Sequence, residues 1–246
     1  MRSNNTFALA AIVVGMVTAL SVAGGTAQAP PSPDQMVASL KQNLAESQKR
    51  LRQYEWIETT AISLKGEEKS RKQQRVYYGA DGKLTKVPMG EAPQAQGGGD
   101  GGGRRGSGRA KQRIVENKVD DMKDYMEKAA NLIHLYVPPT AENIQKAKDA
   151  GKMMVKPPQQ GRVRVEFPDF IQPSDLMAIE VDAKALLLSA LSVATYLEKP
   201  EDTVTLNVKF GSLSDGTGYT AQTTLDAKAK NIRVVVENSG HRPLAR

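Results

Sequence analysis

The stretch Thr203-Val-Thr-Leu-Asn-Val-Lys-Phe210 decides the fold, because apolar and polar residues alternate in it without a break. A period of two places every second side chain on the same face of a β-strand, so the pattern predicts a strand with one dry face and one wet face. Burial on one side only is typical of antiparallel sheets, in which one face packs on a core and the other meets water.

Stretches of similar character lie on both sides of this one. Five of them fall in the last third of the chain, at residues 162–167, 175–182, 185–197, 219–225 and 232–236. Three more fall near its start, at residues 54–64, 69–78 and 83–87, and the second of these is so charged that one of its faces is expected to lie in water. Short Asp/Gly turns between neighbours favour an antiparallel meander of about eight or nine strands, which is too large to stay flat.

Three helices are predicted beside this sheet. The first opens at Ser32 and Pro33, which suit an N-cap and a first helical position, and carries an apolar stripe. The other two are an inserted pair at about residues 111–135 and 141–150, separated by Pro138-Pro139. The predicted fold class is therefore α+β: a curved, half-barrel-like antiparallel sheet, packed on an N-terminal helix and an inserted helical pair, in one domain over residues 30–246.

Residues 1–29 have the features of a secretory signal peptide. Arg2 is their only charged residue, an apolar run follows from Phe7 to Ala23, and small residues close the segment at Ala27-Gln28-Ala29. The alternative is an uncleaved anchor, since about 17 apolar residues just reach across a bilayer. The small residues at the end of the segment favour cleavage. We therefore expect a periplasmic or secreted protein that is not integral to the membrane once the signal peptide has been removed.

A glycine- and arginine-rich segment at about residues 90–110 is predicted to be a flexible loop, since glycine at this density cannot bury enough surface to offset its ordering entropy. The loop and the residues after it carry five cations that suit an anionic surface. The candidate contact residues are Arg104, Arg105, Arg109, Lys111 and Arg113. The alternative is a solvated loop that has no partner.

Composition argues against most catalytic and metal chemistry. The chain of 246 residues has no cysteine and only two histidines, His134 and His241, and we expect the second to be solvated in a terminal tail. No nucleophile elbow or phosphate loop is recognisable, so no catalytic, cofactor or metal residue is assigned, and no enzyme is expected. The net charge of +7 would suit nucleic acid, but export and an aromatic content of only 5% argue against that partner.

The order of these elements resembles the periplasmic lipoprotein-carrier superfamily. The segments Tyr54-Glu-Trp-Ile-Glu-Thr-Thr60, Leu64-Lys-Gly-Glu-Glu-Lys69 and Tyr77-Tyr-Gly-Ala-Asp-Gly-Lys-Leu84 also resemble a group of uncharacterised exported bacterial proteins. The resemblance implies a half-barrel around helices, with a hydrophobic cavity for acyl chains. It lies in the order of elements and not in motifs, so no functional residue is carried over, and the Gly/Arg loop departs from the carrier pattern.

Two functions follow as hypotheses. The first is a non-enzymatic carrier that holds a lipid or other acylated ligand between the sheet and the helices, because apolar strand faces are combined with adaptable methionines. Its candidate cavity or core residues are Trp56, Met122, Met126 and Leu206. The alternative is a purely structural role, in which the methionines only fill the core. The second hypothesis is a cell-envelope interaction module, which contacts another protein or an anionic surface through the basic loop.

Overall fold

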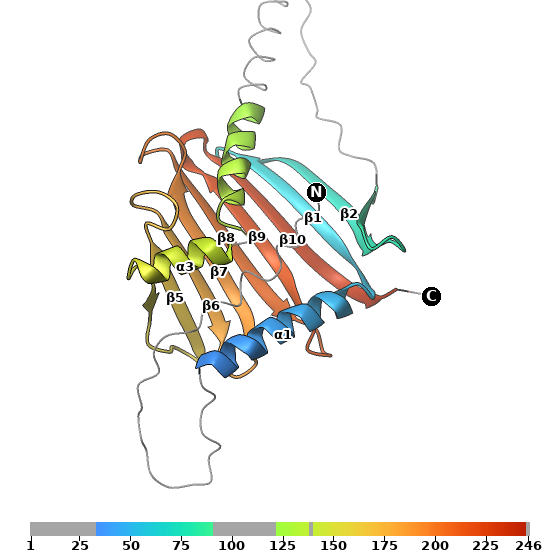
Figure 1. The fold of residues 1–246 in the computed structure, drawn as a ribbon. Coiled ribbons are helices and arrows are strands. Elements are labelled where there is room, and N and C mark those ends of the chain that lie inside the picture. The colour runs from blue at the N-terminus through green and yellow to red at the C-terminus, as the bar shows by residue number, and fades with distance from the viewer. Residues whose placement is uncertain (1–32, 91–121, 138–139, 245–246) are drawn as a thin grey trace, which may run out of the picture.

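The computed structural model describes residues 33–90, 122–137 and 140–244, and these form a ten-stranded antiparallel sheet with helices on one of its faces (Figure 1). The strands are β1 (Tyr54–Leu64), β2 (Glu67–Tyr78), β3 (Leu84–Pro88), β4 (Met154–Val155), β5 (Arg162–Pro168), β6 (Leu176–Asp182), β7 (Leu187–Tyr196), β8 (Thr203–Ser212), β9 (Gly218–Ala227) and β10 (Ile232–Pro243). The predicted fold class, an α+β protein with a curved antiparallel sheet, is confirmed.

The order of the strands in the sheet is β3-β2-β1-β10-β9-β8-β7-β6-β5-β4. The C-terminal part of the chain, from β4 to β10, is a plain meander of neighbours. The N-terminal hairpins then join through β1, which pairs with β10 over the whole length from Leu64↔Ile232 to Tyr54↔Pro243. The first and last strands of the chain are therefore neighbours near the middle of the sheet.

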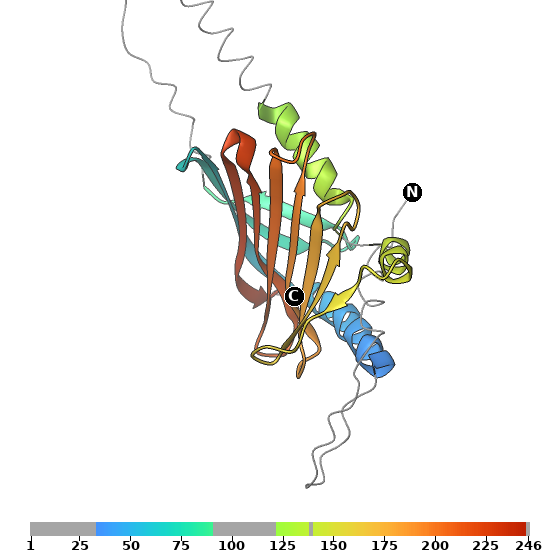
Figure 2. The same cartoon turned by 90° about the vertical axis from the view of Figure 1, so that its left-hand side faces the viewer.

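Three helices lie against the inner face, as the two views of the ribbon show (Figures 1 and 2). They are α1 (Pro33–Leu51), a helix at residues 122–134, and α3 (Ala141–Asp149). The hydroxyl of Thr140 accepts a hydrogen bond from the backbone N–H of Asn143 and so caps α3, as the sequence indicates. These bounds agree with the predicted N-terminal helix and with the described parts of the inserted pair.

The register of the strands brings the predicted dry faces together. One row on the inner face runs from Met177 through Val193, Leu206, Leu225 and Val234 to Ile62, each residue pairing with the next. The first three of these side chains are buried, and they form one core with Ala129 and Ile133 of the helix 122–134 and with Ile144 and Ala147 of α3. Burial of this apolar face is the main force that holds the helices on the sheet.

A buried polar latch fixes the end of the helix 122–134 to this core. The hydroxyl of Tyr136 donates to Asp175 at 2.6 Å and lies 2.8 Å from the hydroxyl of Thr195. Asp175 also accepts from three consecutive backbone N–H groups, of Phe170, Ile171 and Gln172. Because all these groups are paired, the carboxylate of Asp175 is tolerated although the residue is only 2% exposed.

Two details differ from the prediction. The strand β4 has only two residues, and a run of this length gives no periodic signal in the sequence. The strand β10 continues to Pro243, so the expectation that His241 is solvated in a tail is wrong: His241 is half-buried and lies on an aromatic surface. Pairing of β10 with β1 overrides the weak strand propensity of its Asn-Ser-Gly sequence.

Candidate functional site

A cavity of about 420 Å³ lies between α1 and the inner face of the sheet, which places it within the size range of roughly 300–1,000 Å³ found for small-molecule sites. Its walls come from α1, from the end of β2, and from the β7, β8 and β9 strands. The lining residues are Leu44, Ser47, Gln48, Leu51, Arg52, Tyr78, Leu187, Leu188, Phe210, Gly218, Tyr219 and Thr220.

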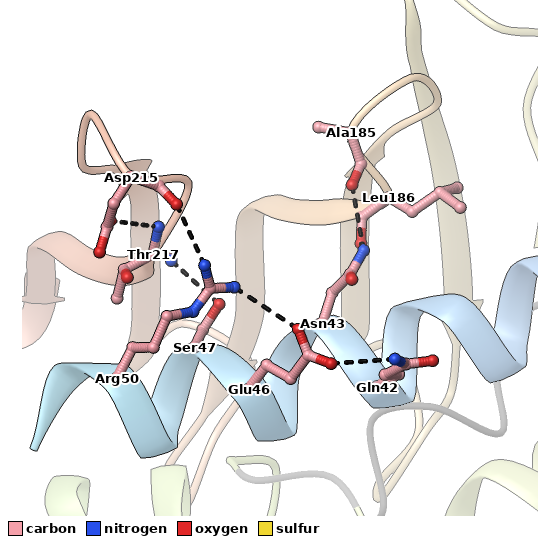
Figure 3. Close-up of polar contacts among 10 residues, drawn as sticks. Gln42, Asn43, Glu46, Ser47, Arg50, Ala185, Leu186, Asp215 and Thr217 are labelled. Atoms are coloured by element: carbon pink, nitrogen blue, oxygen red, sulfur yellow. Dashed lines mark hydrogen bonds and ion pairs between the residues drawn. The ribbon is translucent and has the colours of Figure 1, made fainter.

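Polar contacts hold α1 across the ends of two hairpins, and Figure 3 shows them side by side. The side-chain amide of Asn43 donates to the backbone carbonyls of Ala185 and Leu186, each at 3.2 Å. The hydroxyl of Ser47 accepts from the backbone N–H of Gly218, and the guanidinium of Arg50 donates to the backbone carbonyl of Asp215. Anchored at these points, α1 spans the sheet without filling the space beneath it.

An aromatic cluster lies next to the cavity. His241 stacks on Trp56 with ring centroids 5.7 Å apart, and Tyr219 lies 4.1 Å from the His241 ring on another side. Tyr78 lies 6.1 Å from Trp56. Burial among these rings lowers the pKa of His241 below its usual range, so the imidazole is neutral at neutral pH. Since Tyr78 and Tyr219 also line the cavity, the cluster forms one of its walls.

The position of the cluster is fixed by hydrogen bonds of Asn238 in β10. The indole N–H of Trp56 donates to the side-chain oxygen of Asn238 at 3.1 Å, and the amide of Asn238 donates to the backbone carbonyl of Thr220 at 2.9 Å. The three strands β1, β10 and β9 are thereby linked through side chains as well as through their ladders. A buried Trp that has its N–H paired is a rigid apolar surface.

A second feature, which we call the apolar strip, lies on the inner face across β9, β10 and β1. It consists of Leu225, Val234, Val236 and Ile62, joined by Thr60 and Thr223, and the register places these residues in two neighbouring rows. They are half-buried or, for Ile62, 39% exposed, in contrast to the sealed positions over β5 to β8. The strip and the cavity share one face of the sheet.

The four residues predicted to line a cavity or core are spread along the inner side. Trp56 is buried in the aromatic cluster next to the cavity. Met122 and Met126 are half-buried and pack near Tyr125, Ala227 and Ile232, at the other end of the sheet. Leu206 is buried in the main core. The structure therefore brings only Trp56 close to the cavity, and a ligand contact by any of the four stays a prediction.

The five cations predicted to contact an anionic surface, Arg104, Arg105, Arg109, Lys111 and Arg113, lie outside the described residues. The same is true of the predicted signal peptide at residues 1–29. Both remain predictions. Within residues 33–90, 122–137 and 140–244, none of the helices has the length and apolar character that a membrane span requires.

Sequence reasoning missed the residues that build the cavity wall. Tyr78, Tyr219 and His241 belong to three strands that are far apart in the chain, and no spacing rule connects them. The one usable signal is that aromatic residues are few and that several of them lie at strand ends. Arg52 directly follows an amphipathic helix, and nothing in its local sequence indicates a place at a cavity.

Several acidic side chains in the described part of the chain have structural partners. In the described part of the chain, no three His, Asp or Glu side chains gather as metal ligands. The carboxylates with a clearly lowered pKa are engaged in structural contacts: Asp215 accepts from the backbone N–H of Thr217, and Glu166 accepts from Arg164. What the cavity offers is a space with mixed apolar and polar lining and one cation at its edge.

Among the comparisons with known proteins, the comparison of structures found matches. No protein-family model matches the sequence, and no curated protein matches it significantly. Two solved structures are similar. A LolA superfamily protein from Nitrosomonas europaea is 8% identical, with a TM-score of 0.34 over 83% of this chain and 94% of that chain. A DUF1329 family protein from Desulfovibrio piger is 10% identical, with a TM-score of 0.32 over 84% and 92%.

Both structures are under 25% identical to this chain and have TM-scores below 0.5, so the resemblance to the lipoprotein-carrier superfamily stays an expectation from the order of elements. The alignments are too loose to transfer any residue role, so the site is argued from its own geometry.

Proposed function

We propose that this is an exported, non-enzymatic protein that binds a lipid or another apolar ligand between its sheet and its helices. One observation carries the proposal: the inner face of the sheet is sealed over β5 to β8 but not beneath α1 and not along the apolar strip. Exposed apolar surface that is continuous and rimmed by polar groups is typical of a binding site.

The walls of the cavity support an apolar occupant. Five of its lining residues are leucine or phenylalanine, and Tyr78 and Tyr219 add aromatic surface. Removing such surface from water is worth roughly 25 cal/mol per Å², so a chain or ring system that fills the cavity gains affinity without specific polar contacts. The polar anchors of α1 keep the space open, which reduces the ordering cost of binding.

The experiment has two parts. Native mass spectrometry and solvent extraction of the purified protein would show whether a lipid is retained. Nile red, a neutral apolar dye, would then be titrated into the delipidated protein and into Leu187→Trp, whose larger side chain fills part of the cavity. Leu135→Trp is the matched control, because Leu135 is 52% exposed and does not line the cavity.

We expect dye binding to fall in Leu187→Trp and to be unchanged in Leu135→Trp. Equal dye binding by all three proteins, together with no retained lipid, would contradict the proposal.

A further inference from the structure

The charge in the lining of the cavity is positive and comes from a single residue. Of its twelve residues only Arg52 is charged, and none is acidic. Arg52 follows directly after the last residue of α1, and its guanidinium lies 5.8 Å from the centre of the Tyr78 ring. The cation is therefore held at the edge of the apolar space, against one of the aromatic residues that line it.

Within the described part of the chain, the guanidinium of Arg52 lacks the structural partners that the guanidinium of Arg50, two residues earlier, has. Arg50 donates to the backbone carbonyl of Asp215 and pairs with Glu46, so its charge is engaged in holding α1. Arg52 is exposed and has no carboxylate within 4.0 Å among the described residues. Asp81, in the β2–β3 turn, is paired with Lys83.

The size of the cavity limits the apolar part of an occupant. A methylene group takes up about as much space as a water molecule in the liquid, which is about 30 Å³. The cavity volume of about 420 Å³ therefore holds roughly a dozen methylene groups. One acyl chain of moderate length fills this space. The aromatic wall of Tyr78 and Tyr219 and the side chains of Leu187 and Phe210 offer such a chain only weakly polar surface.

We infer that the ligand is an amphiphile with a single acyl chain and an anionic head group, a carboxylate or a phosphate, whose chain lies beneath α1 and whose head group contacts Arg52. This inference rests on the proposed function and adds to it the chemical class of the ligand and its orientation. Arginine suits the head group because its planar guanidinium donates two parallel hydrogen bonds to a carboxylate or phosphate.

Four probes with the same twelve-carbon chain test the inference by isothermal titration calorimetry: dodecanoate, dodecyl phosphate, dodecanol and dodecylamine. We expect the two anions to bind more tightly than the alcohol and the amine to bind most weakly. The advantage of the anions over dodecanol should shrink when NaCl is raised from 50 to 500 mM, because the contact is partly exposed. The tighter of the two anions identifies the preferred head group, and either result supports the inference.

Arg52→Gln is the deciding variant, with Lys49→Gln as the control of equal charge change. Lys49 is exposed in the last turn of α1 but does not line the cavity. We expect Arg52→Gln to weaken dodecanoate binding about three- to tenfold and to leave dodecanol binding unchanged, since a charge-assisted contact at an exposed site is partly screened. Lys49→Gln should leave both unchanged.

Trp56 reports where the chain lies, because it is the only tryptophan and its ring is 6.1 Å from the Tyr78 ring, which lines the cavity. Dodecanoate brominated on a carbon near its carboxylate should quench the fluorescence of Trp56, because Arg52 and Trp56 both lie beside the Tyr78 ring.

The outcomes separate the two proposals. If dodecanol binds as tightly as dodecanoate and Arg52→Gln changes neither, the anionic head group is overturned while apolar binding stands. Binding of dodecanoate without any quenching of Trp56 would overturn the placement of its chain beneath α1. If none of the four probes binds, the proposed function itself fails.

Discussion

The two halves of the inner face have the same strand pairing and opposite environments. Over β5 to β8, the helix 122–134 and α3 cover the sheet, and Val165, Met177 and Val193 are at most 1% exposed. Over β9, β10 and β1, the same rows continue as the apolar strip, whose residues keep contact with water. Farther on, β2 carries Lys72 and Gln74 on this face.

The difference shows that the covering helices, and not the sheet, decide which apolar residues become core. Alternation of apolar and polar residues creates a dry face along the whole sheet, but stability is gained only where that face is covered. Over β9, β10 and β1 the cover is only partial, so the side chains of the apolar strip stay half-buried or exposed and contribute less to stability than the sealed positions do.

The largest expected effect comes from placing a charge in the sealed half. Leu206 and Ile62 lie in one row of the inner face, but Leu206 is 5% exposed and Ile62 is 39% exposed. Leu206→Asp should lower the free energy of unfolding by at least about 4 kcal/mol, because it buries an unpaired carboxylate. Ile62→Asp should lower it by about 1 kcal/mol or less. Urea denaturation of both variants is the measurement, and equal losses would mean that the two halves are covered alike.

A smaller effect is expected from the tyrosine latch of the sealed half. Tyr136→Phe removes the hydroxyl that joins Asp175 to Thr195, and we expect a loss of about 1–3 kcal/mol, since a buried acceptor loses its partner. Tyr125, near the open half, bonds only to Asp202, whose carboxylate remains accessible. Tyr125→Phe should therefore cost about 1 kcal/mol or less. A cost for Tyr125→Phe that matched that of Tyr136→Phe would contradict the stronger anchoring of the sealed half.

The smallest effect concerns pH and the aromatic cluster. Burial lowers the pKa of His241 below the ordinary value of 6.5, so the unfolded chain binds a proton at a higher pH than the folded protein does. The free energy of unfolding should consequently fall as the pH drops below about 6.5, and it should be at its full value above that pH. Denaturation at pH 8.0 and 5.5 measures the difference, and His241→Gln should reduce it. The pKa values of Asp182 and Asp215 are lowered too, so these carboxylates become protonated only at still lower pH. They do not contribute to the difference between pH 8.0 and 5.5. An unchanged difference in His241→Gln would show that other groups cause it.

Most of the fold could be predicted from the sequence, because its elements are marked by strong local patterns. The alternation at Thr203–Phe210 corresponds to β8, and the charged stretch before Tyr78 corresponds to β2, whose side chains are mostly exposed. The capped helix after Thr140 is found at its predicted position. The two-residue strand β4 and the second half of β10, residues 237–243, were missed, since their strand conformation depends on a neighbour and not on their own residues.

The candidate site could not be predicted in the same way. Arg52, Tyr78, Tyr219 and His241 come together because β1 pairs with both β2 and β10 and because α1 crosses the ends of the hairpins. Those are long-range arrangements, and a local period carries no information about them. Trp56 was identified as a residue of a cavity or core, but its stacking on His241 required a strand where the sequence indicated a tail.

The pairing of β1 with β10 has a consequence for the time course of folding. Residues 65–231 lie between the two strands in the sequence, and the backbone N–H of Leu244 also donates to the carbonyl of Gln53, just after the end of α1. Contacts between such distant residues form late, because they must first overcome the entropy of closing a long loop. The N-terminal hairpins therefore gain their neighbour in the sheet only after β10 has been synthesised, so this side of the sheet is completed late in folding.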